Sequence, residues 1–143
     1  QDSVLNGFMM IDPKKAGIVL IHDGARPLVS QDLISRVIEA TSQKGAAIPV
    51  LPVEDTVKEV AGEEVLRTLE RQELFRVQTP QGFSYSVLKK ALDKASEQGY
   101  YSTDEASLVE RIGKKVYIVQ GDPKNVKITV PEDLRVAEAF LED

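Results

Sequence analysis

Short runs of aliphatic residues alternate along this chain with stretches in which apolar residues recur at helical spacing. The run Ile18–Ile21 has the composition of a strand buried on both faces of a sheet. A helix-like stretch follows, with Ser30 as its N-cap type of residue and Gly45 as its terminator. Strands that alternate with amphipathic helices predict an α/β fold with a mostly parallel sheet.

The remaining segments repeat this alternation. We expect further strands at 46–51, 75–79, 116–119 and 126–130, and helices at 84–97, 105–111 and 131 to about 141. Pro49 and Pro52 predict that the strand at 46–51 ends there or lies at a sheet edge. Residues 4–10 have the pattern of a helix end, and no initiator Met precedes them, so we expect the chain to begin inside a fold. Its 143 residues predict one domain, 1–143.

Residues 53–75 depart from this pattern. Val53, Val57 and Val60 stand among charged residues, and Ala61–Glu64 has the composition of a turn. The segment is predicted to be a hairpin arm that projects from the body. Because a two-stranded hairpin alone is only marginally stable, we expect the arm to pack against a partner, such as a second copy of the chain.

Composition excludes several kinds of function. The chain has no cysteine and a single histidine, His22, so thiolate and multi-histidine metal sites are excluded. A net charge of -5 argues against nucleic-acid binding, and no apolar run reaches the ~18 residues of a membrane span. No nucleophile partner of His22 is evident, and we expect it to be a structural hydrogen-bonding residue. An acidic chain can bind anions only through a local cluster of cations.

Polar residues gather in three loops that follow predicted strands: 22–27, 78–82 and 120–127. In α/β sheets, ligands bind beyond the carboxyl ends of the strands, so these loops mark the expected site. Asp23 could hold a metal ion or a sugar hydroxyl. Arg26 could clamp a phosphate, or it could simply pair with Asp23 and tie the loop.

The other candidates are weak when taken singly. Thr79 and Gln81 could hydrogen-bond a phosphate or polyol, or belong to a plain turn. Thr103 begins a capping box at a helix start, which is also an anion site. Lys127 could be a phosphate ligand or a solvated edge lysine, and Arg71 alone is a surface arginine. Together these residues predict a site for a phosphorylated, hydroxyl-rich small molecule.

Five ordered motifs resemble those of the 2-C-methyl-D-erythritol 4-phosphate cytidylyltransferase family of the non-mevalonate isoprenoid pathway. They are Gln1–Val4, His22–Pro27, Gln78–Phe83, Thr103–Ser107, and Asn125–Thr129 with Pro131–Leu134. The resemblance spans essentially the whole chain. It implies a Rossmann-like three-layer nucleotidyltransferase fold in which 53–75 is a dimerisation arm.

The resemblance also implies a reaction. The phosphate of methylerythritol phosphate would attack the α-phosphorus of CTP, and pyrophosphate would leave. Mg²⁺ is the implied cofactor, a homodimer the implied assembly, and the cytoplasm the implied location. No nucleic acid or membrane is implied as a partner.

Site roles follow from the same resemblance. Arg71 and Lys127 would be the catalytic cations that position the substrate phosphate, with Arg71 completing the neighbouring subunit's site. Substrate contacts would come from Asp23, Arg26, Thr79 and Thr103. Ser3 would contact the nucleotide, and Asp23 would face the magnesium instead of, or as well as, the substrate.

One part of the family pattern is not among the matching motifs: the N-terminal glycine-rich segment that binds the triphosphate. We therefore expect the 143 residues alone to be inactive or nearly so. Ribitol-5-phosphate cytidylyltransferase is an alternative with the same motifs, and a non-catalytic dimerisation or binding fragment is another. A receiver-like domain phosphorylated on Asp23 is disfavoured, because no second acidic cluster follows the first strand.

Overall fold

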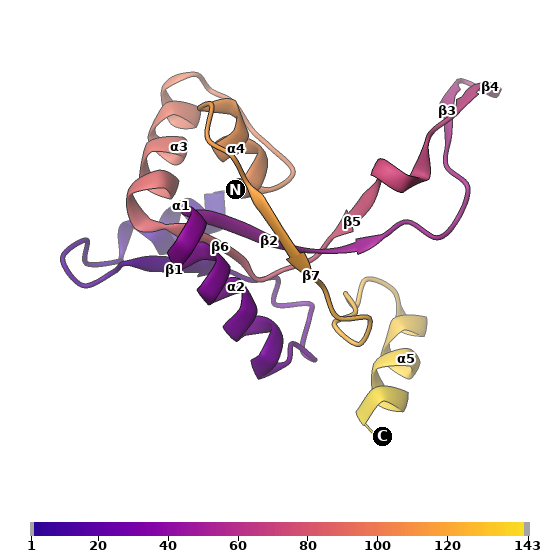
Figure 1. The fold of residues 1–143 in the computed structure, drawn as a ribbon, viewed down its shortest axis with the longest axis horizontal. Coiled ribbons are helices and arrows are strands. Elements are labelled where there is room, and N and C mark those ends of the chain that lie inside the picture. Colours follow the sequence, from indigo (N-terminus) through magenta and orange to yellow (C-terminus); the bar gives the residue numbers. More distant parts are fainter. Residues whose placement is uncertain (1, 142–143) are drawn as a thin grey trace.

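The computed structural model describes residues 2–141 and has an α/β architecture (Figure 1). Its elements are α1 (Asp2–Met9), β1 (Ile18–Ile21), α2 (Gln31–Lys44), β2 (Ala46–Pro52), β3 (Lys58–Ala61), β4 (Glu64–Thr68), the 3-10 helix η1 (Arg71–Glu73), β5 (Phe75–Val77), β6 (Gln81–Ser84), α3 (Tyr85–Glu97), α4 (Glu105–Arg111), β7 (Tyr117–Gln120) and α5 (Pro131–Leu141). Gln1 of the first motif lies outside the described residues. Within residues 2–141, no helix is both long enough and apolar enough to span a membrane.

One five-stranded sheet forms the body, in the order β1–β6–β2–β5, with β7 also paired to β2. Only the β2–β7 pair is parallel, and the other three pairs are antiparallel. The α/β class is confirmed, but the sheet is mixed rather than mostly parallel. The reason is β6, a strand that the sequence pattern did not reveal, which lies between β1 and β2 and runs antiparallel to both.

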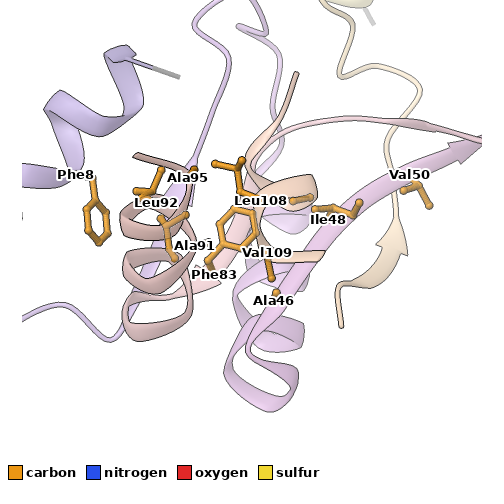
Figure 2. Packing of buried hydrophobic residues seen from close by; sticks show 12 residues of the cluster. Phe8, Ala46, Ile48, Val50, Phe83, Ala91, Leu92, Ala95, Leu108 and Val109 are labelled. Atoms are coloured by element: carbon orange, nitrogen blue, oxygen red, sulfur yellow. The ribbon is translucent and has the colours of Figure 1, made fainter. Parts of the chain in front are cut away.

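Helices cover both faces of this sheet. On β2, the alternate residues Ala46, Ile48 and Val50 join the hydrophobic core that α3 and α4 complete. Figure 2 shows Phe83 of β6 within this cluster, beside Val109 of α4. The preceding residue, Gly82, faces α2 on the opposite side of the sheet. The alternation of side chains along β2 and β6 therefore produces three layers.

Pro49 lies inside a central strand, so the expectation of a strand end or sheet edge is wrong for this residue, whereas Pro52 is the last residue of β2 and the expected strand end is confirmed there. Its carbonyl accepts a hydrogen bond of 2.8 Å from the Gln78 N–H. In a strand, the nitrogen and the carbonyl of one residue point to the same side. The nitrogen of Pro49 therefore faces the gap between the β6 and β5 pairings, where no ladder donor is needed.

The predicted helix limits are confirmed, whereas the predicted strand at 126–130 is wrong. Ser30 caps α2, and Gly45 ends it with a φ of 87°. Residues 121–130 form an irregular loop instead of a strand, because the Ile128 N–H donates to the Ala25 carbonyl of another loop rather than to a strand ladder.

The hairpin predicted within 53–75 consists of β3 and β4, which pair antiparallel around a turn at Gly62. It projects away from the sheet and its helices (Figure 1). All residues of both strands are exposed within the chain. The arm therefore receives little support from the body of its own chain.

Candidate functional site

Three loops meet at one end of the sheet, as the sequence predicts. The Asp23 N–H, after β1, donates to Thr79 Oγ1 between β5 and β6 at 2.9 Å. Asn125 Nδ2, in the loop after β7, donates to the Thr79 carbonyl at 2.8 Å. Thr79 therefore links the loops that carry Asp23 and Lys127.

A carboxylate and two cations form the centre of this site. Asp23 Oδ2 lies 3.1 Å from Lys127 Nζ and 3.4 Å from Arg26 Nε. Arg26 also donates from Nη1 to the Asn125 carbonyl at 2.8 Å. The loop-tying Arg26–Asp23 pair is present, and with Lys127 it forms a cluster of net charge +1. Such a cluster attracts anions in an otherwise acidic chain.

A cavity of about 590 Å³ opens beside this cluster. Six of the seven residues predicted for the site line it: Ser3, Asp23, Arg26, Thr79, Thr103 and Lys127. A second cavity, of about 550 Å³, shares Arg26 and Lys127 with it and extends to Arg76. The two cations therefore lie between two hollows of the surface.

Arg71 is the one predicted residue that the chain does not bring to this cavity. It lies in η1 near the base of the arm, and its Nη1 donates to the Glu54 carbonyl. The lining residues of both cavities exclude it. The residue that it contacts, Glu54, does line the second cavity, so Arg71 lies close to that cavity without lining it.

His22 has the structural role that the sequence predicts. Its Nδ1 lies 3.0 Å from Thr79 Oγ1, and its Nε2 lies 3.0 Å from the Arg26 carbonyl. With the Thr79 hydroxyl donating to Nδ1, the ring donates from Nε2 to that carbonyl. The imidazole thus stabilises the loop that carries Asp23 and Arg26.

The start of α4 differs from the expected capping box. Asp104, not Thr103, is the N-cap, and its carboxylate accepts a hydrogen bond of 3.1 Å from the Ser107 N–H. Among the described residues, the hydroxyl of Thr103 has no protein partner. Gln81 accepts from the Ala106 N–H and donates to Asp104, so its amide is committed to holding α4. Thr103 therefore keeps a hydroxyl available to a ligand.

An unpredicted carboxyl group, Glu105, also lines the cavity. Burial raises the pKa of Glu105 above its ordinary value, and the nearby carboxylates of Asp104 and Asp23 raise it further. The raised pKa reflects the cost of burying this carboxylate beside two others.

Two further polar residues were missed because burial of a polar side chain leaves no periodic signal. Gln78 is 5% exposed and Asn125 is fully buried. Both belong to motifs that the sequence singles out, and this was the available signal. Their hydrogen bonds join the loops after β5 and β7.

The residues of the cavity could hold a magnesium ion only together with the phosphates of a bound substrate. Within residues 2–141, no group of three or more acidic or histidine side chains is arranged to hold a metal. Asp23 uses Oδ2 for both cations, and its Oδ1 has no partner among the described residues. Mg²⁺ is usually held by one or two carboxylates, with substrate phosphates and water completing its shell. Asp23 can supply that one carboxylate.

Fold and site together define a class: an α/β protein with a cation-centred cavity at one end of its sheet, suited to anionic ligands that carry hydroxyl groups. A family model described as IspD, 2-C-methyl-D-erythritol 4-phosphate cytidylyltransferase, matches residues 1–143. The chain belongs to this family of cytidylyltransferases, and the resemblance seen in its motifs is confirmed.

Individual relatives agree. The Bacillus cytotoxicus 2-C-methyl-D-erythritol 4-phosphate cytidylyltransferase is 48% identical over 141 residues, covering 99% of this chain and 62% of that protein. The protein of the same name from Pelotomaculum thermopropionicum is 50% identical over 143 residues, covering 99% and 59%. The chain thus spans about three fifths of the length of these relatives.

Solved structures confirm the predicted Rossmann-like nucleotidyltransferase fold. The crystal structure of 2-C-methyl-D-erythritol 4-phosphate cytidylyltransferase from Thermus thermophilus superposes with a TM-score of 0.89 at 41% identity. The superposition covers 99% of this chain and 68% of the Thermus thermophilus chain. The 4-diphosphocytidyl-2C-methyl-D-erythritol synthase from Anaerococcus prevotii also gives a TM-score of 0.89, at 33% identity, covering 99% of this chain and 65% of that one.

Proposed function

We propose that the protein transfers the cytidylyl group of CTP to 2-C-methyl-D-erythritol 4-phosphate. A phosphate oxygen of the sugar phosphate forms a bond to the α-phosphorus of CTP, and the bond to the leaving pyrophosphate breaks. The other product is 4-diphosphocytidyl-2-C-methyl-D-erythritol. The observation that carries this proposal is the convergence of six residues, each implied by the family motifs, on one cavity.

Charge explains why this reaction needs such a cavity. Two unit negative charges 4 Å apart repel by about 1 kcal/mol in water and about 4 kcal/mol in a partly buried site. Arg26 and Lys127 oppose this repulsion while they hold the substrate phosphate for attack. Positioning and electrostatics are the main contributions a protein makes to such transfers.

The hydroxyl-bearing residues have separate parts in the proposal. Thr79 accepts from the Asp23 N–H and so fixes the carboxylate, besides contacting the substrate. Thr103 offers its hydroxyl to the sugar phosphate from the start of α4. Ser3, on α1, contacts the nucleotide at the edge of the same cavity.

Magnesium is part of the proposal. Asp23 Oδ1 would be its protein ligand, and the ion would neutralise negative charge on the phosphates. The proposed location is the cytoplasm.

A magnesium-dependent assay of pyrophosphate release from CTP and methylerythritol phosphate tests the proposal. It is run on the 143-residue chain and on a chain extended to the length of the relatives. We expect activity in the extended chain alone. Inactivity of both folded chains would overturn the proposal, and preferred turnover of ribitol 5-phosphate would replace the substrate.

The proposed assembly is a homodimer built through the arm. Val60 and Val65 form a cross-strand pair on the hairpin, and their exposed fractions are 59% and 55%. Exposed apolar side chains on a projecting element favour contact with another chain. In the dimer, Arg71 at the base of the arm would reach the partner's site.

The oligomeric state checks this assembly. Replacing both valines, Val60→Lys with Val65→Lys, is expected to give a monomer in sedimentation. Glu64→Lys changes charge in the same strand without removing apolar surface, and should leave the dimer intact. A wild-type monomer at micromolar concentration would contradict the proposed assembly.

A further inference from the structure

Two buried side-chain amides hold the loop that carries Lys127. Gln78 accepts at Oε1 from the Asp122 N–H at 3.0 Å. Its Nε2 donates to the Asp122 carbonyl at 2.9 Å and to the Asn125 carbonyl at 3.2 Å. Both hydrogens of Nε2 are therefore used on one loop.

The second amide links the same loop to a neighbouring one. Asn125 Nδ2 donates to the Thr79 carbonyl at 2.8 Å. The carbonyl of Asn125 accepts from Gln78 and also from Arg26 Nη1 at 2.8 Å. Three groups of the cavity, Thr79, Arg26 and Lys127, are thus connected through one residue.

These bonds matter because residues 121–130 have no regular secondary structure to fix their path. Lys127 comes two residues after Asn125, and its ammonium must reach Asp23 across the gap between two loops. Since Gln78 and Asn125 are buried, water competes little for their hydrogen bonds.

Packing leaves little freedom for a different arrangement. A Cβ atom at Gly121 would lie 2.6 Å from Gln78 Oε1 and 2.9 Å from the Val50 carbonyl. The Gly121 N–H donates to that same carbonyl at 2.8 Å. The start of the loop is therefore held closely against both the sheet and the amide of Gln78.

We propose that Gln78 and Asn125 are positioning residues. They fix Lys127 and Arg26 where these cations hold the substrate phosphate for its attack on the α-phosphorus of CTP. This inference rests on the proposed function. Neither amide acts on the substrate. The Gln78 carboxamide donates both of its hydrogens to backbone carbonyls, and Asn125 is fully buried. Their effect passes through the two cations.

The test uses the protein at the full length of its relatives. Gln78→Met keeps the shape of the side chain and removes its hydrogen bonds. A misplacement of about 1 Å costs about 10²-fold, so we expect kcat/KM for the sugar phosphate to fall by about that factor while KM for CTP stays unchanged. If Gln78→Met does not fold, Gln78→Asn, whose shorter amide cannot reach Asp122, replaces it.

Thr41→Val is the matched control. Thr41 is also buried, and it donates to the Val37 carbonyl within α2 rather than to a residue of the loop that carries Lys127. Its loss removes one buried hydrogen bond with little change of shape. We expect Thr41→Val to retain kcat/KM within about twofold, and an equal loss in both variants would reduce Gln78 to a structural role.

A double-mutant cycle separates positioning from general destabilisation. In a Lys127→Met background, Gln78→Met should lower kcat/KM by a clearly smaller factor than in wild type, because one of the two cations that it positions is already gone. Losses that multiply in full would overturn the proposal.

Amide hydrogen exchange gives a readout that does not need catalysis. In Gln78→Met, amides of residues 121–128 should exchange faster, while core amides of α3 keep their rates. Unchanged exchange at 121–128 would overturn the positioning role. If the wild-type protein lacks cytidylyltransferase activity, the proposed function fails, and the exchange result alone decides whether the amides fix the loop.

Discussion

Lys127 shows how one residue can matter more to a ligand than to the fold. Its side chain is 45% exposed, and that of its partner Asp23 is 35% exposed. Ion pairs this open to water contribute little to stability, because solvent screens them. The charge of Lys127 therefore remains available to an anion in the cavity.

Lys127→Ala is expected to lower kcat/KM by about 10²–10³-fold, the usual loss when one group that stabilises the transition state is removed. The midpoint of thermal unfolding should change little. Pyrophosphate release and a thermal melt measure the two effects. Lys115→Ala, an exposed lysine outside both cavities, is the control, and equal activity of the two variants would exclude Lys127 from the site.

Asn125 has a structural role that its place in the sequence does not reveal. It is fully buried, and its Oδ1 has no hydrogen-bond partner among the described residues. An unsatisfied buried acceptor costs about 1–3 kcal/mol. The residue is nevertheless accommodated because its Nδ2 and carbonyl hold Thr79 and Arg26 in place.

At the scale of elements, α5 depends on a carboxylate in its first turn. Asp133 accepts hydrogen bonds from the Thr129 N–H at 2.8 Å, the Thr129 hydroxyl at 2.9 Å and the Val130 N–H at 3.0 Å. These bonds, led by the one from the Thr129 N–H, hold the pKa of Asp133 below its ordinary value of 3.8. They secure the junction between the Lys127 loop and α5.

A lowered pKa fixes the sign of a pH dependence. Because the folded state favours the carboxylate, its stabilisation is present above the ordinary pKa and is lost as pH falls through the lowered one. Asp133→Ala should therefore melt at a lower temperature than wild type at pH 7, and the gap should narrow from about pH 4 downward. Thermal melts from neutral to strongly acidic pH measure this, and a constant gap would contradict it.

Strand β6 is the element that the sequence pattern failed to reveal. Pro80, Gln81 and Gly82 have the composition of a turn, yet residues 81–84 form a strand in the middle of the sheet. A Cβ on Gly82 would lie 2.2 Å from Thr41 Oγ1 and 2.8 Å from Val37 Cγ1. The glycine is therefore needed for the close approach of α2 rather than for a turn.

Gly82→Ala is expected to lower the free energy of unfolding by about 1–3 kcal/mol through overpacking. Adding Thr41→Ala removes the nearest clashing atom, so the double variant should be more stable than the sum of the two losses predicts, by at least about 0.5 kcal/mol. Urea denaturation measures all three variants. Gly17→Ala, with no heavy atom within 4 Å of the new Cβ, is the control, and an additive cycle would contradict the clash.

At the level of the assembled protein, the main question is which chain's site Arg71 serves. The sequence resemblance implies that Arg71 acts across a dimer, and within one chain it lies outside both cavities. Two variants, each inactive alone, can then restore one another in a mixed dimer.

Equal amounts of Arg71→Ala and Lys127→Ala chains, unfolded and reassociated together, test this sharing. Half of the dimers are mixed, and one of their two sites has both cations, so about a quarter of wild-type activity should return. Each variant reassociated alone provides the baseline. No recovery in verified mixed dimers would show that Arg71 does not complete the partner's site.

Local patterns in the amino-acid sequence were enough to predict the α/β class, the helix limits and the meeting of three loops. Ser30 and Gly45 mark the ends of α2, and Asp23 follows the strand Ile18–Ile21 closely, because caps and apolar periodicity are local properties. The five motifs also determined the family.

Local patterns did not predict the mixed sheet, the place of β6, the position of Pro49 inside β2 or the buried amides of Gln78 and Asn125. These features depend on which segments pair and on what each polar group meets when buried. Such contacts join residues far apart in the chain: Gln78 Nε2 and the Asn125 carbonyl are 47 positions apart in sequence yet 3.2 Å apart in space. No local pattern records a partner at that separation, so the packing of the whole fold decides it.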